Sequence, residues 1–520
     1  MKKIFITMTL IGFISVLYSE QWQILGTRSM GMGGAYVAMA IGPIAQYWNP
    51  AGLAQISTQT FNGFEVSAGV GIETTGGLLS NISEITDVSK QIDAIKNTQD
   101  SQSNDKLDAN QISAFVKTLG ILGKMNEKED SGALVEVAGG LNIKISKIAL
   151  SVNNFTSVGL NPFIDTKNIN IVKTGNAGGN IPTANTTDPG SQYDAAKQNL
   201  IQAIDIIGLS NIKSLLCGGD PLCETTFNNS FQNSQALAYT LINEAINNNL
   251  NPEDINKYSQ EALKYADEAK KVVDNLVSGG SLDNNTSNLN VKAASFTEFS
   301  LGYAREANKL LTGLLIGGNL KVIRGDVGEK TFKFLEEDKT GDAFKNLNDY
   351  EKISVKPSLD MGFLWNVNYK YPKIPFRPRV GLTIRNINSP SFDGPNGKYK
   401  LDRQARFGVA LSPFNWWHWA LDIDLTKNST PVDGFYSRQL SFGTEINIIN
   451  RKSFNLPLRL GMMKNIAESD SKTIYTAGIG ITFAYIHFET AVGISSGKQY
   501  IDGDKYPEKA QAVASLGILF

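Results

Sequence analysis

Few side chains in this sequence are of the types that perform chemistry, and they are far apart. The 520 residues include two His and two Cys. His418 and His487 stand in stretches where apolar and polar residues alternate, outside any G-x-S-x-G or H-E-x-x-H sequence. So few ligands leave almost nothing from which to build a zinc module. We therefore expect no catalytic residue, no metal site and no cofactor, and we expect that the protein is not an enzyme.

The two cysteines are better explained as a structural staple. Cys217 and Cys223 flank the turn-forming residues Gly-Gly-Asp-Pro-Leu at 218–222. A disulfide is expected in a protein exported from the cytoplasm. Closing so short a loop adds about 2 kcal/mol of stability at most. We expect a disulfide between the two cysteines, with no redox role.

Charged side chains in the alternating stretches are the remaining candidates for a site. Several basic ones fall on one face of their stretches and are possible contacts for a ligand carboxylate: Lys321, Arg379, Arg385, Arg406 and Arg459. Acidic residues share that face: Glu298, Asp360, Asp422, Asp424 and Glu445. Two interpretations remain open, a ligand site or a network of ion pairs, and the balance of charge favours the network.

The elements that position these residues are strands. In Gln439–Ile448, apolar side chains alternate strictly with polar ones, which is typical of a strand with one apolar and one polar face. Stretches of 9–11 residues match a tilted membrane crossing. Fourteen are predicted, near 61–73, 133–144, 147–158, 294–304, 310–324, 353–369, 376–387, 403–413, 416–427, 438–449, 456–466, 473–483, 486–496 and 510–520.

Connections between these strands alternate in length along the chain. Long ones, such as 159–293, follow short ones, such as 145–146, which is the pattern of an outer-membrane barrel. The fold predicted is therefore all-β, a transmembrane antiparallel barrel in contact with outer-membrane lipid. The turn near 484–485 holds no Gly or Pro, so the even strand count is weakest there. A mean hydropathy of −0.16 excludes a polytopic helical membrane protein, and a net charge of −1 argues against nucleic-acid binding.

The first residues are expected to be a targeting sequence. Met-Lys-Lys is followed by an apolar run from Ile4 to Leu17 and then by Tyr18 and Ser19. This pattern is typical of a secretory signal peptide over 1–19, cleaved after Ser19. A single membrane anchor is the alternative, but the run is short for a span. We expect export to the bacterial outer membrane.

Two long connections, about 74–132 and 165–293, are expected to be helical insertions on the extracellular side. The clearest helix begins at Asn251-Pro252-Glu253-Asp254, with a capping Asn, Pro at the first helical position and acids at the positive end of the helix dipole. We expect these insertions to cap the mouth of a barrel that spans 61–520. Two alternatives for the insertions remain equal: a lid or docking surface, or an addition to the barrel without a specific function.

Both ends of the mature chain carry a recognisable pattern. The last strand closes on Phe520, which resembles the terminal signal that the barrel-assembly machinery reads. Residues 28–35, Arg-Ser-Met-Gly-Met-Gly-Gly-Ala, and 49–54, Asn-Pro-Ala-Gly-Leu-Ala, resemble the FadL-like superfamily of outer-membrane barrels. That group includes long-chain fatty-acid transporters, PorV-like proteins of type IX secretion and TraF-like plasmid-transfer proteins. The resemblance implies that residues 20–60 plug the lumen, with these motif positions: Arg28, Gly31, Gly33, Gly34, Asn49, Pro50 and Ala51.

The resemblance also implies two functions. The first is uptake of small hydrophobic compounds, such as fatty acids, through a plugged lumen. The second is a structural or docking barrel that binds a protein partner of a secretion or conjugation machine in the cell envelope. The form of the motif is closer to the PorV-like and TraF-like members.

Overall fold

The computed structural model describes most of the chain. The described residues are 21–55, 62–78, 131–165, 183–217, 221–276, 286–333, 351–451, 454–501 and 504–520, with isolated positions between 113 and 123. The predicted signal peptide and most of the first helical insertion lie outside them.

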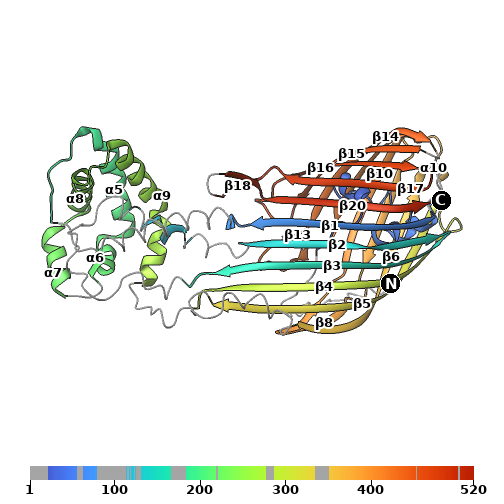
Figure 1. Ribbon diagram of the computed structural model, residues 1–520, viewed down its shortest axis with the longest axis horizontal. Coiled ribbons are helices and arrows are strands. Elements are labelled where there is room, and N and C mark those ends of the chain that lie inside the picture. Colours follow the sequence, from blue (N-terminus) through green and yellow to red (C-terminus); the bar gives the residue numbers. More distant parts are fainter. Residues whose placement is uncertain are drawn as a thin grey trace, which may run out of the picture.

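Fourteen antiparallel strands close into one barrel, as the alternation predicts. Each strand pairs with the next one along the wall, and β20 pairs with β1 to close the ring. Figure 1 shows the strands side by side in the barrel wall, with the C-terminus at the end where the short turns lie. The strands are β1 Gly63–Thr75, β2 Gly132–Ile145, β3 Ile148–Phe163, β4 Asn288–Glu306, β5 Leu314–Lys333, β6 Glu351–Asn366, β7 Arg379–Arg385, β10 Gln404–Phe414, β11 Trp417–Asp424, β14 Gln439–Arg451, β15 Phe454–Asn465, β16 Ile474–Phe483, β17 Ile486–Ser495 and β20 Lys509–Leu519.

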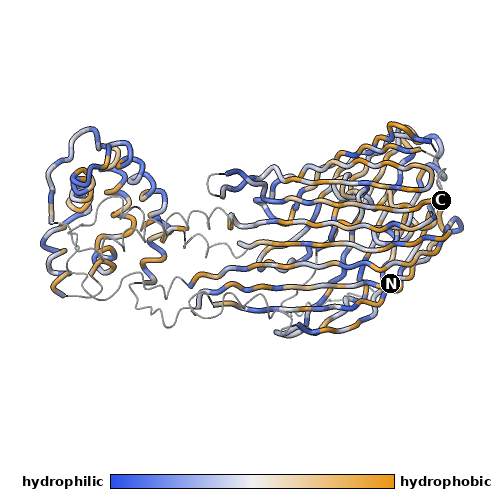
Figure 2. The backbone as a smooth tube through the Cα atoms, viewed as in Figure 1, coloured by the Kyte–Doolittle hydropathy of each residue, from blue (hydrophilic) through white to orange (hydrophobic). Residues whose placement is uncertain are grey.

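The outer face of the barrel is apolar and the inner face is polar. In β1, Val66, Val70 and Ile72 are about half exposed. Glu65 and Ser67, on either side of Val66, are buried in the interior. Figure 2 shows apolar residues recurring along the strands. A closed barrel satisfies all of its backbone hydrogen bonds between strands, so it can cross a hydrocarbon layer with apolar side chains facing lipid. We treat the barrel as membrane-spanning.

The structure corrects the predicted strands in two places. The strand predicted at 310–324 begins at Leu314, because residues 307–313 form a turn that ends at Gly313 with a φ of 84°. β4 and β5 also run past the predicted ends, since β4 begins at Asn288 and β5 ends at Lys333. The doubtful turn near 484 is real, since Ala484 takes a positive φ of 56° where a glycine is usual.

Three two-stranded hairpins lie in the long connections and were not predicted. They are β8 Ser391–Gly394 with β9 Gly397–Lys400, β12 Asn428–Ser429 with β13 Tyr436–Ser437, and β18 Lys498–Ile501 with β19 Asp504–Pro507.

The second insertion folds into helices that lie beyond the long-connection end of the barrel (Figure 1). They are α5 Asp194–Ile207, α6 Leu209–Cys217, α7 Pro221–Ser230, α8 Ser234–Asn247 and α9 Pro252–Leu276. Asn251 caps α9 as expected, accepting a hydrogen bond from the backbone N–H of Asp254. Cys217 and Cys223 form a disulfide that joins α6 to α7. No single helix in the described part of the chain is long and apolar enough to cross a membrane, although the bent pair Ser191–Ile207 and Leu209–Cys217 passes by length and composition.

The helices share one hydrophobic core of their own. Ile255, Ala262 and Tyr265 of α9 are buried in it, together with Leu200 of α5 and Leu241 of α8. The described positions of the first insertion join the same core: Val116, Leu119 and Ile121. The two insertions therefore form one helical unit.

Candidate functional site

Residues 21–55 lie inside the barrel, and we call them the plug. They contain α1 Thr27–Gly31, α2 Ala45–Trp48 and the short 3-10 helix η1 Pro50–Ala54. Nearly all of these residues are buried, including Trp48 at the centre of the apolar cluster. The plug therefore fills the lumen instead of lining it.

The plug rests on a belt of glycines in the barrel wall. A Cβ built on Gly443 would lie 2.3 Å from the carbonyl oxygen of Met32, and one on Gly461 would lie 2.4 Å from the nitrogen of Gly33. Such contacts are possible only where no side chain stands between wall and plug. The belt has one member in each of nine strands: Gly302, Gly317, Gly362, Gly381, Gly408, Gly443, Gly461, Gly478 and Gly493.

Polar groups fix the plug at its backbone. The Asp422 carboxylate accepts hydrogen bonds from the N–H groups of Tyr36 at 2.7 Å and Val37 at 2.8 Å. Asn49 donates to the carbonyl of Val37 within the plug and to that of Phe363 in β6. These bonds satisfy buried backbone groups that the irregular plug would otherwise leave unpaired.

Arg28 joins the plug to the wall through charge. Its guanidinium donates to both oxygens of Glu445, each at 2.7 Å, and Arg459 donates to the same carboxylate at 2.6 Å. Arg459 also reaches Glu489, which accepts from Thr27 of the plug. Burial acts to lower the pKa of Arg28, but the facing Glu445 outweighs it and the pKa is raised. The guanidinium therefore remains charged.

The other motif residues lie where plug and wall meet. Gly31 accepts a hydrogen bond from the Thr476 hydroxyl, and Gly34 accepts one from Arg406. Gly33 and Gly34 have positive φ angles of 66° and 85°. In η1, Pro50 and Ala51 pack against Gly317 of β5.

Four of the five predicted ligand contacts are paired with acids in the wall, Arg459 as described above. The amino group of Lys321 lies 2.9 Å from Asp360 and 3.3 Å from Glu298. Arg385 pairs with Glu298 at 3.0 Å, and its guanidinium stacks over Tyr47 of the plug. Arg406 pairs with Asp424 and stacks over Trp22. These side chains form the ion-pair network that the charge balance favours.

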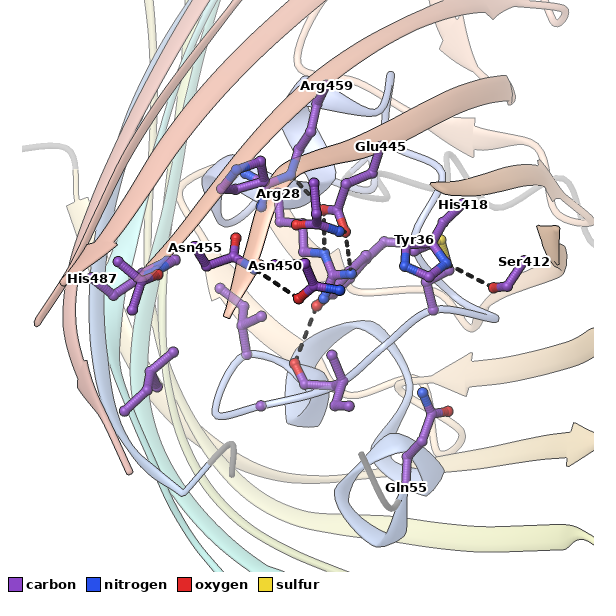
Figure 3. A pocket seen from close by; sticks show the side chains of 18 of the residues that line it. Arg28, Tyr36, Gln55, Ser412, His418, Glu445, Asn450, Asn455, Arg459 and His487 are labelled. Carbon is purple, nitrogen blue, oxygen red and sulfur yellow. Dashed lines mark hydrogen bonds and ion pairs between the residues drawn. The ribbon is translucent and has the colours of Figure 1, made fainter. Parts of the chain in front are cut away.

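The fifth, Arg379, faces a cavity of about 370 Å³ between the plug and the short-turn end of the barrel. Figure 3 shows this cavity with the Arg28–Glu445 pair at its centre and Ser412 and His418 at one side. Turn residues reach its rim, among them Asn415 and Tyr485. The plug adds apolar lining: Met39, Ile41, Pro43 and Ile44. This cavity could not be predicted from the sequence, because its residues come from eight separated segments and no single pattern joins them.

The opposite mouth is crossed by the connection between β11 and β14, residues 425–438, which we call the strap. Pro431 accepts a hydrogen bond from the Asn161 side chain, and the N–H of Asp433 donates back to it at 2.6 Å. Asp433 also pairs with Lys292 of β4. In the closed ring β2–β4 lie across from β11 and β14, so the strap spans the lumen.

Each of the two histidines lies beside a hydroxyl group. His418 Nδ1 lies 2.8 Å from the Ser412 hydroxyl, and His487 Nδ1 lies 3.0 Å from the Thr482 hydroxyl. His487 also lies beside Glu489, which Arg459 already holds. Within the described residues, no three His, Cys, Asp or Glu side chains are grouped as metal ligands would be.

Comparison with protein families gives one match. The profile of the family described as "F plasmid transfer operon, TraF, protein" matches residues 46–424, nearly three quarters of the chain. No curated protein sequence is significantly similar to the chain.

Several solved structures of low sequence identity are similar over their whole length. The toluene transporter TbuX of Ralstonia pickettii aligns at 9% identity and a TM-score of 0.41, covering 95% of this chain and 98% of its own. The toluene transporter TodX of Pseudomonas putida aligns at 10% identity and 0.40, covering 97% and 100%. A FadL homologue of Pseudomonas aeruginosa aligns at 8% identity and 0.37, covering 98% and 99%.

Proposed function

The chain belongs to the family of F plasmid transfer operon TraF proteins, and within it we propose a barrel of the bacterial outer membrane that takes up small hydrophobic compounds. This family is one of the branches that the Arg28–Ala35 and Asn49–Ala54 motifs resemble, so the family assignment from sequence is confirmed. The fatty acids named in the sequence analysis are one class of cargo within the proposal.

The observation that carries the proposal is the cavity beside the plug. Small-molecule sites are concave, of about 300–1,000 Å³, and combine apolar walls with a few polar groups. This cavity, at about 370 Å³, has Met39, Ile41 and Ile44 in its lining beside arginine and asparagine side chains. Such a lining suits a compound with an apolar body and a polar end.

The plug must move for any compound to pass. It contacts wall backbone along the glycine belt, and the strap crosses the other mouth. A tether between plug and wall is therefore the sharpest test. A Cβ on Gly34 would lie 3.9 Å from the Cβ of Ser441, which is within the range that a disulfide bridges.

We expect Gly34→Cys/Ser441→Cys to support uptake only when reduced. The measurement is growth on oleate in a host strain that lacks its own outer-membrane fatty-acid transporter. Oxidation should abolish the growth that this chain restores, and reductant should return it. Gly34→Cys alone is the control, since it carries the same strain at positive φ without a partner thiol. Growth that persists with the tether closed, or growth no better than without the chain, would contradict the proposal.

A docking role in an envelope machine is the second candidate. The helical unit favours it, because five helices with their own core and a disulfide exceed what a simple connection requires. A partner protein held at the helical unit would identify this role, and loss of the partner after deletion of 183–276 would locate the contact.

A further inference from the structure

We propose that Arg377 and Arg379 form a binding site for a small oxyanion, a carboxylate or a phosphate, at the short-turn end of the barrel. The site goes beyond the proposed uptake, because it holds whether or not a compound passes the plug.

The two guanidinium groups converge on one residue. Arg377 Nε donates to the Ser412 carbonyl oxygen at 3.1 Å, and Arg379 Nη2 donates to the Ser412 hydroxyl at 3.1 Å. Ser412 is buried, and its hydroxyl is also bonded to His418. Two positive charges are therefore held beside one residue at the cavity wall.

No carboxylate forms an ion pair with either of these two guanidinium groups among the described residues. The further partner of Arg377 is the Asn415 side-chain oxygen, which is neutral. By contrast, Arg28 and Arg459 share Glu445 in the same cavity. Elsewhere in the lumen the buried basic side chains described above all face acids. A convergent pair without a carboxylate partner in an enclosed space attracts an anion.

The backbone that carries Arg377 is held in an uncommon conformation. Phe376 and Arg377 have positive φ angles of 64° and 44°, which side chains other than glycine rarely adopt. The loop is pinned on both sides, because Ser412 N–H donates to the Phe376 carbonyl and Val367 N–H donates to that of Pro378. Strained residues that the surroundings hold in place recur at ligand sites. Here the strain directs the Arg377 guanidinium to Ser412.

The geometry suits an oxyanion better than a halide or a neutral ligand. Each guanidinium is a planar fork that can donate two parallel hydrogen bonds to a carboxylate or phosphate. Each has N–H groups beyond those that bind Ser412 and Asn415. Amide side chains of Asn450 and Asn455, which are hydrogen-bonded to each other, lie in the same cavity (Figure 3). Tyr369 and Tyr485 also line it.

The test is calorimetric titration of the full chain in detergent with inorganic phosphate and, separately, with succinate. We expect at least one probe to bind the wild type, and Arg379→Gln and Arg377→Gln each to weaken that binding tenfold or more. Binding of phosphate alone would identify a phosphate site, and binding of succinate alone a carboxylate site. Arg379→Lys should lose most of the affinity as well, because it keeps the charge but not the fork.

Arg451→Gln is the matched control. Arg451 lines the same cavity and carries the same charge, but it is exposed and does not reach Ser412. Its loss should leave affinity within twofold of wild type. A wild type that binds neither probe, or an Arg451→Gln loss as large as that of Arg379→Gln, would overturn the proposal. Heat-modifiable migration in gels checks that each variant is folded, and Arg377→Gln, in a turn outside the strands, provides the test if Arg379→Gln does not fold.

Discussion

The carboxylate of Glu445 holds two arginines from different parts of the chain, Arg28 in the plug and Arg459 in β15. All three side chains are largely buried, so the attraction is weakly screened and the loss of one partner is costly. This one carboxylate therefore couples the position of the plug to the wall.

Glu445→Gln should destabilise the protein by about 3–5 kcal/mol, because it leaves two buried guanidinium groups short of one charge. The measurement is the unfolding midpoint in urea, in detergent. Lys147→Gln is the control, since the Lys147–Glu306 pair is exposed at a short turn and should contribute nothing measurable. Equal midpoints for the two variants would show that the buried pair does not stabilise the plug.

The sequence predicted which face these charges occupy but not how they pair. Strict alternation places Glu445 and Arg459 on the inner face whatever their partners are. Pairing depends on the shear of the barrel and on the path of the plug, and Arg28 is 417 positions from Glu445. Arg377 was missed as a site residue because the strand was predicted from 376, whereas β7 begins at Arg379 and Arg377 lies in the turn before it.

At the scale of elements, the glycine belt explains how an irregular plug fits inside regular strands. Nine strands each have a glycine at the level of the plug, and plug atoms lie against them, with plug backbone closest at Gly317, Gly381, Gly443 and Gly461. The common level of these glycines became visible only once the register of every strand was known.

β5 offers a matched pair of substitutions. A Cβ on Gly317 would lie 2.5 Å from the backbone of Pro50, whereas one on the adjacent Gly318 would meet only the Asp360 carbonyl at 3.2 Å. Gly317→Ala should therefore cost about 1–3 kcal/mol through overpacking. Gly318→Ala should cost clearly less. Urea unfolding midpoints compare the two, and an equal loss would show that the plug does not rest on the belt.

At the scale of the whole molecule, the barrel is closed by separate devices at its two ends. The plug fills the lumen toward the short turns, and the strap spans the opposite mouth. Alternation and connection lengths were enough to predict the fourteen strands of the barrel. They could not predict the strap or the β8–β9 hairpin, because inward-folding loops have no period and contact strands that are distant in the sequence. Phe392 of that hairpin, for example, is buried against Phe296 of β4.

The proposed function requires that this closed barrel binds and passes a small compound. The most direct test is native mass spectrometry of the full chain, extracted gently from its own outer membrane. We expect a bound species of a few hundred daltons. Met39→Arg places a charge in the apolar cavity lining, so it should remove this species without loss of the barrel. A barrel that carries a protein partner and no small compound would contradict the uptake function and favour docking at the helical unit.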